Sequence, residues 1–460
     1  MDRRSLLLSA GSIGGLLGLG SYHQRRRLRR WDDRDALRTA RDRDRPTLET
    51  ETTLTVSDEH LETARDDLEE LLAETRAAWP DFEDQLNDLP REVRRAQSRL
   101  EAAEDTLSDA ADRFADSSDR TPVERLELLE DLRDGLRSAG HALAFAQVER
   151  NDRDTDDVVD ELDTVEDEYE RVSEAITYYA DDLPWAVAAY GDLDDYLEGV
   201  RTTIASGRRA LERGDSAHGS DADPDRTDWI GADELARASI PVFVVEALLE
   251  DIEHFEAHLH DEADTTTDAA PTLESRYESL EDDLETRLDA IDFSYDDERS
   301  SYARDIWTPF EFDRSDGSDE RRRGRIALAV RLIAERDAVV RTLEEFADMP
   351  SLATLNNDDP LRSSFETTGE DVLEAARSAD ETLENRLEAD GDHLLVHHLC
   401  TVIIEDRDWT DTRLERTLDD INEDSDEEWT LALERLRLGY LEVEAFVTEL
   451  PAVLEAIGGT

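Results

Sequence analysis

Residues 91–116 read REVRRAQSRLEAAEDTLSDAADRFAD, and the spacing of apolar side chains in this stretch decides the fold class. The apolar residues recur at alternating steps of three and four positions: Val93, Ala96, Leu100, Ala103, Leu107, Ala110 and Phe114. Such heptad spacing is typical of a helix that buries one narrow seam against a neighbour, while charged residues cover its other faces. The stretch therefore predicts a long helix that lies side by side with others.

The same spacing recurs on both sides of this stretch, which predicts a bundle of long helices. The sequence Thr121-Pro122-Val123-Glu124 is typical of a helix start, with Thr121 as the N-cap and Glu124 bonding back to the cap. The predicted helices cover residues 61–79, 93–114, 122–146, 158–179 and 184–213. Short polar turns join them, so neighbouring helices should run antiparallel within one bundle over residues 57–214.

A break in the apolar pattern follows this bundle. Residues 214–228, GDSAHGSDADPDRTD, contain no large apolar side chain, so we place an acidic linker at 215–230 and a second helical domain at 231–460. Helices of the second domain are predicted at residues 240–261, 272–291, 319–347, 367–389, 391–407 and 425–457. The sequence therefore predicts an all-α protein with two helical domains, built as long-helix antiparallel bundles with coiled-coil-like seams.

The charge balance excludes one class of partner. The 460 residues carry a formal net charge of −68, whereas binding to a phosphate backbone needs a basic surface, so we expect no nucleic-acid partner. All 52 basic residues are Arg. This acidic, lysine-free composition resembles that of proteins from salt-loving archaea, in which concentrated salt screens the repulsion between carboxylates. A codon bias towards Arg in a GC-rich genome gives the same composition.

The N-terminal residues 1–22 resemble a twin-arginine export signal. Arg3 and Arg4 match its paired arginines, and Leu6 and Leu7 match the apolar pair that follows. The residue before the arginines and the residue after the leucines depart from the usual signal. The apolar, glycine-rich run is about 17 residues long, or ~25 Å as a helix, which is short of the ~30 Å core of a bilayer. Together with the composition, this start resembles that of a haloarchaeal helical protein with a twin-arginine-like signal that is either removed or kept as an anchor.

A second arginine cluster, from Arg25 to Arg30, bears on the membrane topology. A basic flank stays on the cytoplasmic side by the positive-inside rule, whereas a twin-arginine signal directs the chain outside. We expect a protein of the cell envelope, extracytoplasmic or membrane-anchored, with the cytoplasmic face of the membrane as the alternative. Residues 23–56 form an Arg-rich segment and an extended linker. Their arginines either contact anionic lipid head groups or pair with nearby Asp along a solvated helix.

Two groups of histidines are the candidate metal ligands. His254 and His258 lie in DIEHFEAHLH, and His393 and His397 lie in DHLLVHHLC. Residues four apart share one face of a helix, so each pair can offer two imidazoles to one metal ion. The alternative is structural, with His397 in the core and His254 and His258 as surface polar residues.

No catalytic motif accompanies these histidines. The sequence lacks G-x-S-x-G, H-E-x-x-H and G-x-G-x-x-G, and the absence of lysine removes P-loop and Schiff-base chemistry. We therefore expect no enzymatic activity and no cofactor. The predicted function is that of a structural or interaction protein of the cell envelope, exported or tethered by its N-terminus, with helical faces that contact a protein partner or a second copy. The alternative is a helical ligand- or metal-binding module that uses the two histidine groups.

Overall fold

The chain is helical and divides into two compact units. The computed structural model describes residues 32–48, 52–79, 91–116, 120–216, 231–290, 317–347, 367–390, 393–420 and 426–458. Within these ranges no strand forms, apart from an isolated antiparallel bridge between Tyr179 and Asp268, so the predicted all-α class is confirmed. Unit 1 comprises Met1–Glu49, Glu278–Ser315 and Leu332–Thr460, and unit 2 comprises Thr50–Tyr277 and Asp316–Arg331.

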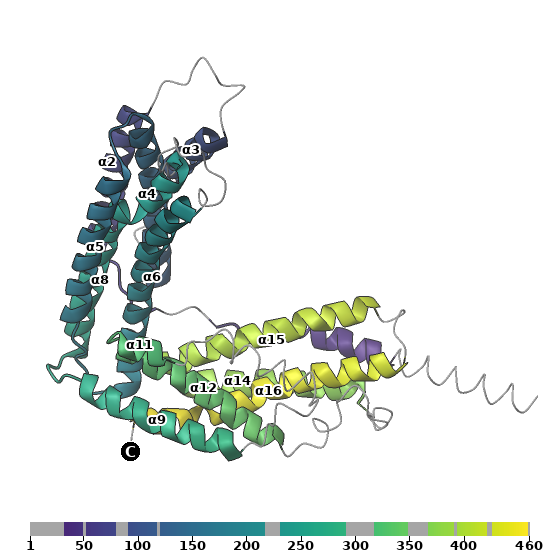
Figure 1. Ribbon diagram of the computed structural model, residues 1–460. Helices are drawn as coiled ribbons and strands as arrows, with labels where there is room; N and C mark the ends of the chain where they lie inside the picture. Colours follow the sequence, from purple (N-terminus) through teal and green to yellow (C-terminus); the bar gives the residue numbers. More distant parts are fainter. Residues whose placement is uncertain are drawn as a thin grey trace, which may run out of the picture. The chain divides into compact units, whose positions relative to one another are not determined.

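Unit 2 is a bundle of long helices. Its helices are α2 (Asp58–Ala78), α3 (Arg91–Asp116), α4 (Pro122–Glu149), α5 (Thr155–Ala175), α6 (Leu183–Ser216), α7 (Ala232–Ala238), α8 (Ile240–Ala263) and α11 (Ser318–Arg322). In Figure 1, α2, α4, α6 and α8 run side by side. Helix α4 packs against α2, α3, α7 and α8, and α8 also packs against α5 and α6. The core of unit 2 therefore centres on α4 and α8.

The heptad seam of α3 is buried within unit 2. Val93, Ala96 and Ala103 are buried on the side where α3 packs against α4. Most of the seam is therefore covered by unit 2 itself, whereas Leu107 and Phe114 are half-buried. The helix start at Thr121 is also confirmed, because Glu124 N donates to Thr121 Oγ1 at 3.2 Å and Thr121 N donates to Glu124 Oε2 at 2.8 Å.

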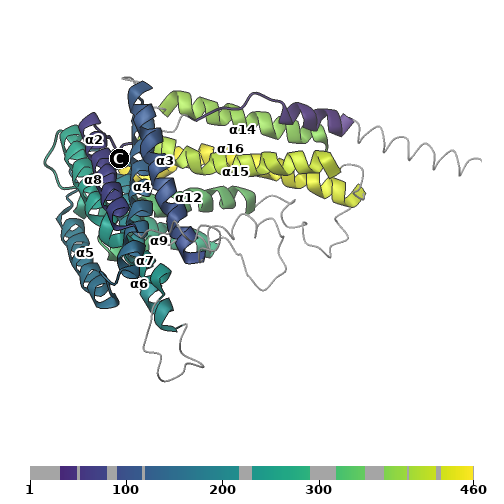
Figure 2. The same cartoon turned by 90° about the horizontal axis from the view of Figure 1, so that it is seen from above.

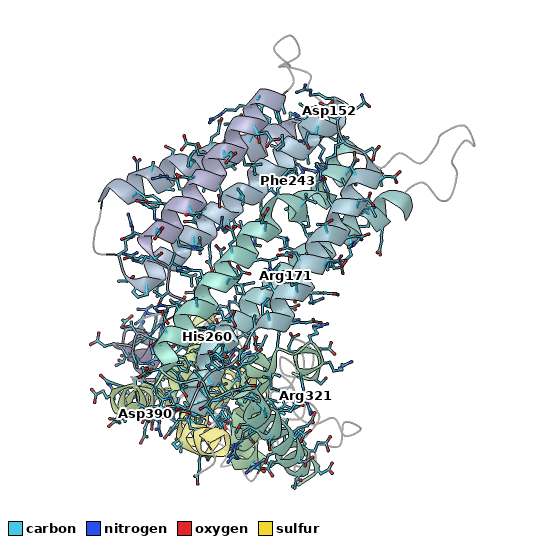
Figure 3. The ribbon with its side chains drawn as sticks, turned by 90° about the vertical axis from the view of Figure 1, so that its left-hand side faces the viewer. Asp152, Arg171, Phe243, His260, Arg321 and Asp390 are labelled. Carbon is cyan, nitrogen blue, oxygen red and sulfur yellow. The ribbon has the colours of Figure 1, made fainter. Side chains whose placement is uncertain are left out.

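Two glycines let neighbouring helices approach α4 closely. A Cβ at Gly135 would lie 2.8 Å from Leu68 Cδ2, and a Cβ at Gly140 would lie 2.8 Å from Phe243 Cβ. Figure 3 labels Phe243 on α8, among the packed helices of unit 2. Helix α4 is therefore buried on more than the one seam that its leucines predicted.

Helix α5 ends earlier than its apolar pattern predicted. The pattern continues to Tyr179, whereas the helix ends at Ala175. The residues that follow pair with the segment after α8, where Ala180 N donates to Thr267 O at 3.0 Å and Ala269 N donates to Tyr178 O at 2.7 Å. The prediction was wrong here because this pairing offers the backbone partners that the last helical turn would have supplied.

The chain does not divide into its two units at the predicted domain boundary. An acidic linker at 215–230 was expected to separate two helical domains, but α7 and α8 pack against α4 and α6 and belong to unit 2. The physical reason is apolar burial, because Leu235, Val244 and Leu248 on these helices are covered there. Residues 217–230 lie outside the described residues.

The extended segment before α2 packs against the helices of unit 2. Thr53, Leu54 and Val56 are buried, and Thr53 Oγ1 donates to Asp192 Oδ2 on α6 at 2.9 Å. This part of the predicted linker, at 23–56, is therefore fixed to the bundle by its alternating apolar side chains.

Unit 1 contains a second group of long helices. They are a helix at residues 32–41, α14 (Gly369–Asp390), α15 (Leu394–Asp420) and α16 (Asp426–Gly458). Figure 2 shows α14, α15 and α16 lengthwise beside one another, and α16 packs against both of the others. Helices α9 (Ala270–Ala290) and α12 (Ile326–Ala347) each contribute residues to both units.

Two helix boundaries in this part differ from the predicted ones. The helix predicted at 319–347 is interrupted after α11, where Gly324 adopts a φ of +81° before α12 begins. The helix predicted at 391–407 continues as α15 to Asp420. No helix among the described residues combines the length and the apolar character needed to cross a membrane.

Candidate functional site

A fully buried carboxylate, Asp251 on α8, is the centre of a polar network inside unit 2. Arg133 on α4 donates to it twice, from Nε to Oδ2 at 2.9 Å and from Nη2 to Oδ1 at 2.6 Å. The third nitrogen of this guanidinium, Nη1, donates to Asp67 Oδ2 on α2 at 3.1 Å. A single arginine therefore joins three helices.

Two further side chains complete the shell of Asp251. The hydroxyl of Tyr196 on α6 donates to Oδ2 at 2.7 Å, and His60 Nε2 on α2 lies 2.7 Å from Oδ1. Burial by itself would raise the pKa of Asp251, but the hydrogen bonds from His60 and Arg133 outweigh burial, and the pKa is lowered. Asp251 therefore stays ionised and serves as the anion that holds the four helices together.

A pocket of about 520 Å³ lies beside this network. Arg133 and Tyr196 belong both to the network and to the pocket wall. The walls come from the segment before α2, from α4, α6 and α8, and their residues are Thr52, Leu54, Leu126, Glu130, Arg133, Asp134, Arg137, Asp192, Asp195, Tyr196, Gly199, Val200 and Leu248. The pocket therefore combines an apolar side with a carboxylate-rich side.

A second buried carboxylate in unit 2, Asp194, holds the start of α12. Its Oδ2 accepts from Leu328 N at 3.0 Å, and its Oδ1 accepts from the hydroxyl of Tyr178 at 2.8 Å. Burial raises the pKa of Asp194 to about 7, even though these hydrogen bonds act in the opposite direction. This carboxyl therefore titrates near neutral pH.

Of the predicted histidine pair on α8, His254 stacks on another histidine. The ring of His254 lies parallel to that of His60, with 4.3 Å between the ring centroids. Burial lowers the pKa of His254, and the neighbouring His60 and His258 lower it further. His258 is half-buried on the same helix. His254 is therefore linked to the Asp251 network by its contact with His60.

The second predicted pair lies at the start of α15. His397 is buried, His393 is half-buried, and His397 N donates to His393 O at 3.1 Å in the first turn. These two histidines belong to unit 1, whereas His254 and His258 belong to unit 2. Within the residues that the structure describes, no group of three or more His, Cys, Asp or Glu side chains is arranged to hold a metal ion.

The carboxylate of Asp33 fixes the N-terminal helix, residues 32–41, inside unit 1. Asp33 accepts from Gly369 N at 2.7 Å, at the first turn of α14, and from Trp429 Nε1 on α16 at 3.1 Å. The positive end of the α14 dipole also stabilises a carboxylate at this position. Figure 2 shows this helix, in purple, beside α14.

Arg43 anchors the residues that follow this helix. Its guanidinium pairs with Asp380 on α14 and lies 3.0 Å from Asp411 Oδ1 on α15. It also lies 4.9 Å from the ring centroid of Tyr440, and its side chain is 6% exposed. Arg43 therefore has neither predicted role, because it pairs inside unit 1 and not with lipid or with Asp along a solvated helix.

The surface arginines of the segment behave differently. Arg38 lies 3.6 Å from Asp35, and Arg41 lies 2.7 Å from Asp42, and all four side chains are at least 41% exposed. The signal residues Arg3, Arg4, Leu6 and Leu7 lie outside the described residues.

Sequence reasoning did not find the network of Arg133, Tyr196 and His60, although one signal for it exists. Asp251 follows the buried Leu248 by three residues and precedes the buried Phe255 by four, so its carboxylate sits on the apolar face of α8. A charge at such a position indicates a buried partner, because an unpaired ion there is very costly.

Two family models match the chain. Residues 59–266 match a domain of unknown function (DUF8262), and residues 244–459 match a second domain of unknown function (DUF8264). The first match continues across residues 215–230, as unit 2 does, and the two matches overlap over residues 244–266, most of which belong to α8. No curated protein and no solved structure matches the chain.

Proposed function

We propose that the protein is a non-enzymatic structural or interaction protein of the cell envelope, exported or tethered by its N-terminal segment. The observation that carries this proposal is the docking of residues 32–48 in unit 1. Asp33 and Arg43 fix this segment through buried polar contacts, so a signal or anchor in the preceding residues is joined to a folded body.

The chemistry of the interior supports a non-enzymatic role. The carboxylate of Asp251 is occupied by Arg133, Tyr196 and His60, which leaves it engaged on both oxygens. Such an arrangement joins helices, whereas a general base needs an oxygen directed at a substrate.

One surface feature supports contact with a protein partner. Trp409 on α15 is 54% exposed, and the guanidinium carbon of Arg413 lies 3.7 Å from its ring centroid. Trp and Arg are enriched at the energetic centres of protein interfaces. The rest of the proposal, including the envelope location, depends on the signal residues.

Localisation of the native protein tests the proposal. The wild-type chain should fractionate with the membrane or outside it, and an Arg3→Gln/Arg4→Gln variant should accumulate in the cytoplasm. An Arg38→Gln/Arg41→Gln variant is the matched control, because it removes two arginines that pair only at the surface. A cytoplasmic wild-type protein, or equal distribution of all three proteins, would overturn the proposal.

A further inference from the structure

The pocket of unit 2 has an apolar wall. Leu54, Leu126, Val200 and Leu248 line it, and they come from the segment before α2 and from α4, α6 and α8 respectively. Its volume of about 520 Å³ falls in the range of small-molecule sites, which is roughly 300–1,000 Å³. An apolar body of a few carbon atoms can therefore be covered here.

The cations at the pocket are already engaged. Arg133 uses its Nε and Nη2 on Asp251 and its Nη1 on Asp67, and neither of these carboxylates lines the pocket. Arg137, the other arginine of the wall, pairs with Asp134. A negatively charged ligand would therefore have to displace an existing ion pair.

More carboxylates than arginines line the pocket: Glu130, Asp134, Asp192 and Asp195, compared with Arg133 and Arg137. Asp192 lies 2.7 Å from Arg331 Nη1, whereas the Asp195 carboxylate lies 3.9 Å from the same arginine. Glu130 makes no hydrogen bond or ion pair with the part of the chain that the structure describes. Burial raises the pKa of Glu130, and the neighbouring Asp134 raises it further. A ligand cation beside Glu130 would relieve this repulsion.

Gly199 lines the pocket on its α6 side. A Cβ built at this position meets no atom within 4 Å, so the residue faces open space. Glycine inside a helix is less stable than alanine by roughly 0.5–1 kcal/mol. Position 199 therefore keeps volume free within the pocket wall at some expense of helix stability.

We propose that this pocket binds a small organic cation, an ammonium or guanidinium group on an apolar chain. The apolar chain lies on Leu54, Leu126, Val200 and Leu248, and the cationic group lies at Glu130. A bare metal ion fits less well, because it needs several converging oxygen ligands and gains nothing from the leucines. The inference goes beyond the proposed interaction function and does not depend on the location of the protein in the cell.

Titration calorimetry with n-hexylammonium chloride tests the site on the full-length protein in molar KCl. High salt suppresses diffuse attraction to the acidic surface, so saturable binding at one site is expected to come from the pocket. The neutral 1-hexanol and the anionic hexanoate have the same chain and should bind at least about tenfold more weakly, because they lack the charge that Glu130 recognises. Equal affinity for hexanol, or no saturable binding of hexylammonium, would overturn the proposal.

Matched variants place the binding in the pocket. Glu130→Gln should weaken hexylammonium binding about tenfold, whereas Glu149→Gln, at an exposed position at the end of α4 that does not line the pocket, should leave it unchanged. Gly199→Leu should abolish binding by filling the open space, and Gly199→Ala should bind nearly as the wild type does. Circular dichroism verifies that each variant is folded. An equal loss in Glu149→Gln, or full binding by Gly199→Leu, would show that the ligand lies elsewhere.

Discussion

Arg133 and Asp251 form a two-point ion pair in the interior of unit 2, with Nε–Oδ2 and Nη2–Oδ1 distances of 2.9 and 2.6 Å. The planar guanidinium fork matches the two carboxylate oxygens, and a lysine ammonium could not replace it. In a chain whose basic residues are all Arg, each buried cation can take such a geometry. The pair therefore fixes the mutual orientation of α4 and α8 as well as their contact.

Breaking this pair should strongly destabilise the fold. Arg133→Met leaves the buried carboxylate of Asp251 without its main counter-charge, which is expected to cost about 3–5 kcal/mol of unfolding free energy. Urea unfolding in molar KCl, followed by circular dichroism, measures the loss. The control is Arg113→Met, because the Arg113–Asp131 pair is exposed and should be worth about 0–1 kcal/mol. Similar losses in both variants would contradict the prediction.

Asp194 should make the fold less stable as the pH rises towards neutrality. Burial raises its pKa from 3.8 to about 7, so between these values the folded state keeps a proton that the unfolded chain has released. Its contribution is fully present below the lower value and is lost as the pH rises through the upper one, by about 1.4 kcal/mol per pH unit.

The variant Asp194→Asn isolates this effect. Asn keeps an oxygen for Leu328 N, and the Tyr178 hydroxyl can still donate to Gly324 O, which lies 3.1 Å away. Thermal unfolding at a series of pH values should show that the stability of the variant relative to the wild type increases up to about pH 7. Above that pH the difference between the two proteins should stay constant. Parallel curves over the whole range would contradict the assignment.

Removing Arg43 should release the N-terminal segment from unit 1. In Arg43→Met, the carboxylates of Asp380 and Asp411 lose a buried counter-charge, so the free energy of local opening should fall by about 3–5 kcal/mol. Hydrogen exchange read by mass spectrometry should show faster exchange at residues 32–48. Arg41→Gln is the control, because Arg41 pairs at the surface with Asp42. Unchanged exchange in Arg43→Met would mean that apolar contacts alone hold the segment.

The fold should depend on concentrated salt. With a net charge of −68, repulsion between carboxylates is screened only when the Debye length is short. Helicity should therefore fall below roughly 0.5 M KCl, because screening weakens there. Circular dichroism across a KCl series measures this, with sucrose at matched osmolality as the control for non-ionic stabilisation. Full helicity in dilute buffer would contradict the expectation.

Filling one helix position should stabilise the protein without closing the pocket. Gly199→Ala adds a Cβ that meets no atom within 4 Å and should raise the unfolding free energy by about 0.5–1 kcal/mol. The contrasting variant is Gly140→Ala, whose Cβ would lie 2.8 Å from Phe243 Cβ and should destabilise the fold. Unfolding midpoints in urea compare the two, and a shift in the same direction for both would contradict the packing described for these glycines.

The helices of this chain could be predicted because their signals are local. The seam from Val93 to Phe114 and the capping box at Thr121 each depend on residues within a few positions of one another. The break after Ala175 could not be predicted in this way, because it depends on pairing between residues near Tyr178 and residues near Asp268. Such a partner is distant in the sequence and leaves no periodic signal.

The candidate site was predictable only in part, for the same reason. His254 is indicated by its spacing from His258, but its stacking partner His60 lies in another helix. The apolar spacing around Asp251 indicates that a partner exists, although it does not identify Arg133 on α4. The pocket is less predictable still, since its walls come from four separate segments of the chain.

The close contact between Gly369 and Asp33 gives a marker that can be read in any related sequence. A Cβ at position 369 would overlap the backbone carbonyl of Asp33, so no side chain fits while the N-terminal helix is docked. A related chain with alanine or a larger residue there must hold its N-terminal helix differently, or leave it free. The residue type at position 369 thus distinguishes homologues whose N-terminal helix can dock as it does here from those in which it cannot.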